Sequence, residues 1–98
     1  MACTKKEILD FLIKNKASFQ REFSIKKIGL FGSIARGEAT DESDIDIVVE
    51  LEKADMFYMI GIKQALEDNF GCRVDVVRMR KTMNPTLRRR IEKDAVFI

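Results

Sequence analysis

Three aspartates in the sequence have the residue type and spacing of a site for hard cations. Asp44 and Asp46 stand two residues apart in a β-branched segment, so on a strand their carboxylates point to one side, with Cα atoms roughly 6–7 Å apart. Asp75, on the next predicted strand, supplies a third carboxylate if the two strands are neighbours. Magnesium prefers oxygen ligands and keeps waters and substrate phosphates in its shell, so these carboxylates suit a nucleotide–Mg²⁺ site. The alternative, more common for an isolated Asp-x-Asp, is that the aspartates only solvate an exposed sheet face.

A glycine and a serine precede these aspartates, where a predicted strand opens into a short helix. Unpaired backbone N–H groups and the positive end of the helix dipole can hold a phosphate at such a point. Gly32 lets the backbone approach closely, Ser33 Oγ adds a donor, and the planar fork of Arg36 can reach a phosphate oxygen. Taken alone, Gly-Ser is a turn, and an arginine one helical turn along is as often solvated.

The composition restricts the available chemistry. The chain has no histidine, which excludes Ser-His-Asp and Cys-His catalysis and leaves carboxylates, backbone amides and cations. The net charge is only +2, but residues 38–55 hold eight acids against one base, and residues 71–98 hold eight bases against three acids. These two blocks predict a cation site and an anion site. Cys3 and Cys72 form no disulfide framework or zinc knuckle, and we interpret them as a terminal thiol and a buried small hydrophobe.

The length of 98 residues predicts a single domain over residues 1–98, with a core just large enough to fold unaided. No apolar run approaches the ~20 residues that a membrane span needs. The segment from Met1 to Lys5 lacks the apolar region of a secretory signal. We therefore expect a cytoplasmic protein that does not enter a membrane.

Apolar periodicity and turn residues predict alternating helices and strands. The predicted caps are Thr4 with Glu7, Asp55, Gly71, and Asn84 followed by Pro85. The predicted elements are a helix over 5–19, a strand over 24–31, one or two helical turns over 34–37, a polar loop over 38–43, a strand over 44–50, a helix over 56–70, a strand over 72–78, a helix from 84, and a tail over 95–98 that is strand or packed coil. Alternation puts Asp44, Asp46 and Val48 on one face of their strand. This order favours a small α/β domain with helices packed on a sheet.

The motifs occur together as Gly32-Ser33-Ile34-Ala35-Arg36-Gly37, then Ser43-Asp44-Ile45-Asp46, then Val74-Asp75-Val76. In this combination the whole chain resembles the minimal nucleotidyltransferases of the DNA polymerase β-like superfamily, whose pattern is Gly-Ser, Asp-x-Asp on the next strand, and a third Asp. The resemblance implies an α/β (α+β) fold, with a small mixed β-sheet and helices packed on it. It also implies an enzyme, a Mg²⁺-dependent nucleotidyltransferase that uses ATP or another nucleoside triphosphate.

The resemblance further implies a role for each motif residue. The implied nucleotide-binding residues are Gly32 and Ser33, which hold the triphosphate, with Arg36 and Ser43. Asp44, Asp46 and Asp75 are the implied catalytic residues and the ligands of two Mg²⁺ ions, and Asp75 can receive the acceptor proton. The chemistry agrees, because in-line attack on an α-phosphate needs both the attacking and the leaving oxygen stabilised, and two metal ions do this without histidine.

The resemblance also implies a partner. Similar small proteins are paired with helical HEPN-type toxins in toxin–antitoxin modules, where the nucleotidyltransferase is the antitoxin and can transfer AMP from ATP to a toxin tyrosine. We therefore expect a HEPN-type toxin as partner and a tyrosine hydroxyl as acceptor. A partner that supplies the acceptor explains how so short a chain could have a substrate.

Two other functions stay open at this point. The chain could neutralise its partner mainly by binding it, or bind nucleic acid through the basic run Arg88-Arg89-Arg90. Nucleic acid is not favoured, since no aromatic residues interleave that run, and a solvated helix face explains it equally well. The apolar stretch 56–60 exceeds what one helix face can bury. We expect core packing there, with a partner or self-association surface as the alternative, so a homodimer and a hetero-oligomer are both open.

Overall fold

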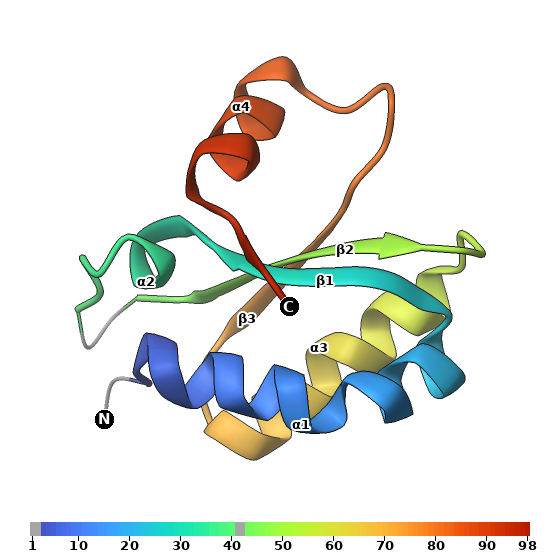
Figure 1. Cartoon of the computed structure of the whole chain (residues 1–98), viewed down its shortest axis with the longest axis horizontal. Helices are drawn as coiled ribbons and strands as arrows, with labels where there is room; N and C mark the ends of the chain where they lie inside the picture. The colour runs from blue at the N-terminus through green and yellow to red at the C-terminus, as the bar shows by residue number, and fades with distance from the viewer. Residues whose placement is uncertain (1–2, 41–42) are drawn as a thin grey trace.

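Residues 3–40 and 43–98, the part of the chain that the computed structural model describes, form alternating helices and strands (Figure 1). The helices are α1 (Lys5–Phe23), α2 (Gly32–Ala35), α3 (Met56–Phe70) and α4 (Pro85–Asp94), and the strands are β1 (Ile25–Phe31), β2 (Ile45–Leu51), β3 (Val74–Arg78) and β4 (Val96–Phe97). The expected α/β (α+β) fold is confirmed. Asp41 and Glu42, which belong to the predicted polar loop and acidic block, lie outside the described residues, as do Met1 and Ala2.

The strands form one mixed sheet in the order β3-β2-β1-β4. β1 is antiparallel to both β2 and β4, whereas β2 and β3 run parallel, and α3 lies between them in the chain. A parallel pair needs such a crossover, because a tight hairpin reverses the chain direction. The register places Asp75 of β3 opposite Asp46 of β2, and Phe31 of β1 opposite Asp46 on its other side. The two aspartate-bearing strands are therefore neighbours.

Helices cover both faces of this sheet. α1 and α3 pack on one face, and α4 lies over the other (Figure 1). The core under α1 and α3 takes in Ile45, Ile47 and Val49 of β2, whereas Val48 packs with Phe31 and Ile91 under α4. The predicted alternation along β2 is confirmed. The apolar side chains that bury this strand therefore also direct Asp46 toward the α4 side.

The helix ends follow the predicted capping residues. Thr4 Oγ1 accepts a hydrogen bond from Glu7 N at 3.1 Å, Asp55 Oδ1 from Phe57 N at 2.8 Å, and Asn84 Oδ1 from Thr86 N at 2.8 Å. Gly71 follows α3 with a φ of 65°, a left-handed conformation that favours glycine. α1 continues past its predicted end at residue 19, because Phe19 and Phe23 prolong its packed face with ring centroids 5.6 Å apart. α2 begins at Gly32, earlier than predicted.

The start of α3 differs from the core packing that we expected for residues 56–60. The stretch 56–60 does not pack in the core as a whole, because Met56, Phe57 and Ile60 are 76%, 79% and 53% exposed. Ile62 and Leu66, four residues apart, define the buried face of this helix. Positions 56, 57 and 60 point away from that face. α3 therefore presents three large apolar side chains to solvent.

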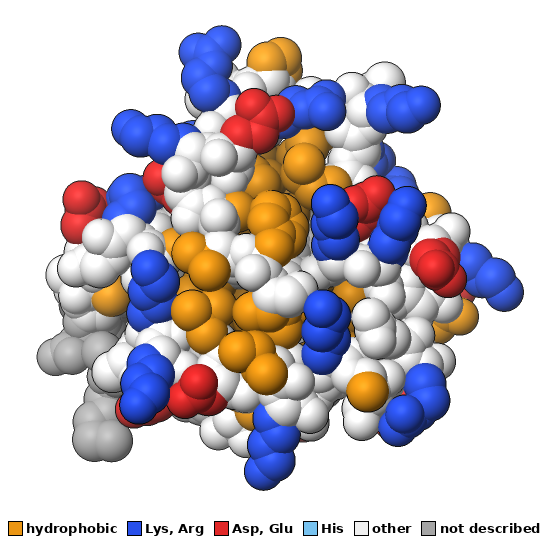
Figure 2. Space-filling model, viewed as in Figure 1, with side chains coloured by type: hydrophobic (Ala, Val, Ile, Leu, Met, Phe, Trp, Pro, Cys, Tyr) orange, Lys and Arg blue, Asp and Glu red, His pale blue; other side chains and the backbone are white. Residues whose placement is uncertain are grey.

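Other apolar side chains also reach the surface. Figure 2 shows them gathered between α4 and α1, on the face that carries the last strand. Ile13 of α1 and Phe97 of β4 are large apolar residues in exposed positions. None of the helices formed by residues 3–40 and 43–98 has the length and hydropathy of a membrane span.

The structure brings the two cysteines together. Their Sγ atoms lie 2.9 Å apart, and the Cys72 thiol also faces Phe70 O at 3.5 Å. Both side chains are half-buried, so Cys72 is less buried than the small buried hydrophobe that we expected, although it packs against the core. Burial and the contact with Cys72 raise the pKa of the Cys3 thiol to about 11, which keeps it protonated at neutral pH. The contact joins the start of α1 to the loop before β3.

Gly61 of α3 is expected to tolerate alanine only when Phe23 is shortened. In an open helix position, Gly→Ala stabilises by about 1 kcal/mol. Here a Cβ would collide with Cε1 of the Phe23 ring and lie 3.1 Å from Cδ1 and Cζ, so Gly61→Ala should lower the free energy of unfolding by about 1 kcal/mol. In a Phe23→Ala background the same change should be neutral or stabilising. Urea denaturation of the four proteins measures this, and an equal effect of Gly61→Ala in both backgrounds would contradict it.

Candidate functional site

A cleft of about 440 Å³ lies at β3, one of the two edge strands of the sheet described, between α3 and α4. Its walls carry two carboxylates, Asp46 and Asp75, and two cations, Lys63 and Arg90. Apolar side chains that include Phe31 and Leu87 surround these charges. The cleft thus unites residues from the acidic and the basic blocks that the sequence separates.

The carboxylate of Asp46 has a raised pKa. Asp46 is half-buried, and this burial is the largest cause of its raised pKa. The negative charges of Asp75 and Asp44 raise the pKa further. The positive charges of Arg90 and Arg36 act in the opposite direction, but the net shift is upward. An ionised Asp46 is therefore less favourable here than in water, and a nearby cation would relieve that cost.

The three aspartates do not form a closed cage. Among residues 3–40 and 43–98, no group of three or more Asp, Glu or Cys side chains converges closely enough to enclose a metal ion. Asp46 and Asp75 are side by side in the register, Asp44 lies within electrostatic range of Asp46, and Asp75 is exposed. Oxygen ligands in an open arrangement fit Mg²⁺, which keeps waters and phosphate oxygens in its shell.

Gly32 sits directly against the carboxylate of Asp46. It starts α2 with a φ of +79°, and a Cβ at this position would collide with Asp46 Oδ2. Both the left-handed backbone and the close approach therefore require glycine. Ser33, the next residue, is half-buried in the single turn of α2, which the bond from Glu38 N to Ser33 O extends at 2.9 Å. The predicted junction of strand, glycine and helix is present, and it borders Asp46.

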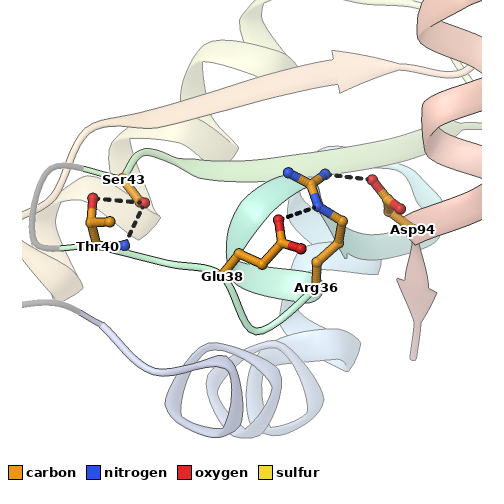
Figure 3. Close-up of polar contacts among 5 residues, drawn as sticks. All are labelled: Arg36, Glu38, Thr40, Ser43 and Asp94. Atoms are coloured by element: carbon orange, nitrogen blue, oxygen red, sulfur yellow. Dashed lines mark hydrogen bonds and ion pairs between the residues drawn. The ribbon is translucent and has the colours of Figure 1, made fainter.

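The guanidinium of Arg36 pairs with carboxylates that do not line the cleft. Its Nη1 donates to Asp94 Oδ2 at 2.7 Å and its Nε donates to Glu38 Oε2 at 3.0 Å (Figure 3). Arg36 does not line the cleft, and its guanidinium instead joins the end of α2 to the end of α4.

Ser43 is likewise held by its own loop. Its Oγ accepts a hydrogen bond from Thr40 N at 2.8 Å and lies 3.4 Å from Thr40 Oγ1 (Figure 3). Of the predicted site residues, the structure therefore brings Gly32, Asp46 and Asp75 into contact or register. Only Asp46 and Asp75 of the predicted site residues line the cleft, and its lining does not include Gly32, Ser33, Arg36, Ser43 or Asp44.

Lys63 and Arg90 are cleft residues that the motifs did not single out. Lys63 follows Ile62 on α3 and belongs to no recognisable pattern. Arg90 is part of the basic run Arg88-Arg89-Arg90, whose role stayed open, but its position along α4 carries information about where it lies. It is adjacent to Ile91 and three residues after Leu87, the apolar residues that turn α4 toward the sheet. The same spacing puts Arg88 on the other side of Leu87 and Ile91, so the pattern separates Arg88 and Arg90 from Arg89 but does not choose between them.

Comparisons with known proteins agree with the geometry. The family described as polymerase beta, nucleotidyltransferase matches residues 13–98. The "Putative protein adenylyltransferase MJ0128" of Methanocaldococcus jannaschii is 38% identical over 96 residues, which cover 97% of this chain and 98% of that one.

Solved structures share the fold. One named "Structure of putative minimal nucleotidyltransferase" aligns with a TM-score of 0.72 and 32% identity over 92% of each chain. A second, a tri-AMPylated Shewanella oneidensis HEPN toxin in complex with MNT antitoxin, aligns with a TM-score of 0.62 and 20% identity over 90% of this chain and 69% of that one. With the family match and the 38% identical relative, the chain belongs to the polymerase beta nucleotidyltransferase family.

Proposed function

We propose that this protein is a Mg²⁺-dependent adenylyltransferase that moves AMP from ATP to a tyrosine hydroxyl of a HEPN-type toxin and thereby acts as its antitoxin. The observation that carries the proposal is the pair Asp46 and Asp75, side by side on parallel strands and bordered by Gly32. Relatives support the reaction and the partner, because one is named a protein adenylyltransferase and a structural neighbour is an AMPylated HEPN toxin with its antitoxin.

The aspartates fit the metal that this reaction uses. Asp44 and Asp46 would hold Mg²⁺ beside the triphosphate, and Asp75 would share the ion next to the acceptor. The raised pKa of Asp46 supports this role, because burial and neighbouring negative charges leave a carboxylate that a divalent cation would stabilise. When bound, two Mg²⁺ ions stabilise the negative charge on the attacking and leaving oxygens.

The chain's own residues position the reacting atoms. The Gly32 backbone and Ser33 bind the phosphates at the start of α2, where no Cβ obstructs Asp46. The acceptor oxygen attacks the α-phosphorus of ATP and forms the new P–O bond, while the bond from that phosphorus to the β-bridging oxygen breaks and pyrophosphate leaves. Asp75 takes the proton of the hydroxyl. Arg36 and Ser43 stay predictions as nucleotide ligands, since each has other partners here.

A second candidate function is neutralisation of the toxin by binding alone. The observation that favours it is the exposed apolar surface of Met56, Phe57 and Ile60 on α3, next to the cleft. The two functions differ in their need for the carboxylates. Neutralisation by binding would survive loss of Asp46, whereas neutralisation by AMP transfer would not.

Asp46→Asn is expected to reduce AMP transfer by on the order of 100-fold or more, because it removes a charge that stabilises the transition state. The measurement is transfer of α-phosphate label from ATP, with and without Mg²⁺, to proteins in a lysate of the source organism that contains the intact partner. Asp10→Asn, an exposed aspartate on α1, is the matched control and should keep full activity. Equal labelling by the wild type and Asp46→Asn would refute the proposal.

The same substitution is expected to stabilise the metal-free protein at neutral pH. Because folding raises the pKa of Asp46, the folded state binds the proton more tightly, and stability falls as the pH rises through the interval between the unfolded and folded pKa values. Asp46→Asn removes this loss. Its gain in melting temperature should be present at pH 7 and disappear below about pH 4, near the usual Asp pKa. Thermal unfolding in the presence of a chelator measures it, and a gain that is unchanged at acid pH would contradict the assignment.

Gly32→Ala is expected to abolish transfer, since a Cβ would displace the Asp46 carboxylate. Gly37→Ala is the matched control, because Gly37 also has a positive φ, +76°, but has no atom within 4 Å of a Cβ. Both variants carry backbone strain that costs about 1 kcal/mol of stability, and the clash with Asp46 adds to the loss in Gly32→Ala. Only Gly32→Ala should lose activity in the labelling assay. Similar activity in the two variants would show that the close approach to Asp46 is dispensable.

A further inference from the structure

The two cysteines of the chain lie together at one corner of the molecule, although 69 positions separate them in the sequence. Their Sγ atoms are 2.9 Å apart. Both sulfurs also face the carbonyl oxygen of Phe70, at 3.8 Å from Cys3 and 3.5 Å from Cys72. Bonded sulfurs lie about 2.0 Å apart, so a small movement would join these two. Both side chains are half-buried and not enclosed, which leaves the pair accessible to a small molecule.

Contacts beside the two cysteines hold them in this place. Cys3 directly precedes Thr4, which caps α1 by accepting a hydrogen bond from Glu7 N at 3.1 Å. Phe11 of α1 packs edge to face on Phe70 at the end of α3, with ring centroids 5.2 Å apart. The cap and the packing of α1 on α3 therefore keep the two thiols close to each other.

Cys72 lies in the short link between α3 and β3, beside the start of α1 (Figure 1). The next residue, Arg73, accepts a hydrogen bond at its carbonyl oxygen from Ile45 N at 2.9 Å. Val74 N, in turn, donates to Glu67 Oε2 at 3.3 Å. A covalent bond at Cys72 would thus restrain the first residues of both β2 and β3, the strands that carry the site aspartates.

We propose that Cys3 and Cys72 are a site of reversible oxidation, at which a small-molecule disulfide converts the two thiols into an intramolecular cross-link. The cross-link ties the start of α1 to the start of β3 and encloses most of the chain. Closing so long a loop restricts the unfolded chain strongly, so oxidation stabilises the fold. The proposal does not depend on the proposed transferase activity.

The cross-link forms by two thiol–disulfide exchanges. Burial and the contact with Cys72 raise the pKa of the Cys3 thiol to about 11, so Cys3 keeps its proton and the first attack falls to Cys72. The Cys72 sulfur loses its proton and bonds to one sulfur of the small disulfide, whose S–S bond breaks and whose other half leaves as a thiol. The Cys3 sulfur then loses its proton, attacks Cys72 Sγ and releases the second half as a thiol. Two protein thiols are oxidised, and one small disulfide is reduced to two thiols.

Oxidised glutathione, a small-molecule disulfide, tests the site on the full chain. Intact-mass spectrometry should show a product that is lighter than the reduced protein by two hydrogen atoms. Its melting temperature should exceed that of the reduced protein by roughly 10 °C or more, and dithiothreitol should reverse both changes. The proposal is wrong if the wild type does not react, stops at a glutathione adduct, forms a disulfide-linked dimer, or is cross-linked with no rise in melting temperature.

Cys3→Ser and Cys72→Ser are the matched controls, because each leaves a single thiol in the chain. Neither variant can form the cross-link, so oxidised glutathione should not raise the melting temperature of either one. A rise as large as that of the wild type in either variant would show that the cross-link is not the cause. The wild-type comparison of oxidised with reduced protein stands even if a serine variant folds poorly.

Amide hydrogen exchange locates the effect in the fold. Oxidation of the wild type should slow exchange at the amides of Ile45 and Val74, at the starts of β2 and β3, by roughly tenfold or more. The amide of Ala95, which donates to Ile91 O at 2.8 Å at the end of α4, is the internal reference and should change far less. Equal slowing at all three amides would contradict a restraint that acts at the starts of the two strands.

Discussion

The register between β2 and β3 is the constraint on which the site depends. Parallel pairing sets Asp46 opposite Asp75, and the period of two along each strand puts both carboxylates on the side away from the larger core. A slip of one residue would turn Ile45 and Ile47 out of the core and the aspartates into it. The free energy of burying those apolar side chains therefore also holds the carboxylates in place. Stability and geometry are fixed by the same pairing.

Some features of this site nevertheless lower the stability of the fold. Burial and two neighbouring carboxylates make the ionised form of Asp46 less favourable. Asp46 also contacts Gly32, whose left-handed backbone few other residue types adopt. Such features reduce stability when no ligand is bound, and they are common where a protein must bind charge. The ionised carboxylate of Asp46 thus lowers the stability of the sheet that holds it, and a cation beside it would offset this cost.

Much of this arrangement follows from local patterns in the sequence. Caps such as Thr4, Asp55 and Asn84 act within one helical turn, so the positions of the helices could be predicted from them. The alternation in β2 depends only on that strand, and it predicted which way Asp46 points. The adjacency of Asp75 was conditional, because strand order is a property of the whole sheet.

What could not be predicted depends on contacts between distant segments. Arg36 looked free to bind phosphate, yet it pairs with Asp94, 58 residues later. Lys63 has no motif, and only the packing of α3 and α4 around β3 brings it into the cleft. The exposure of Met56 and Phe57 depends on which face of α3 meets the sheet, and a run that is apolar on every side does not encode that choice.

The unequal cores on the two faces of the sheet have a consequence for motion. Ile91 is the one buried residue described in α4, whereas α1 contributes Ile8, Leu12 and Phe19 to the opposite core. Local opening costs least where few apolar contacts break. Detachment of α4 is therefore expected to cost less than detachment of α1, and it would move away the wall that bears Arg90 while β2 and β3 keep Asp46 and Asp75 in register. The cleft could then widen without any change in the pairing of β2 with β3.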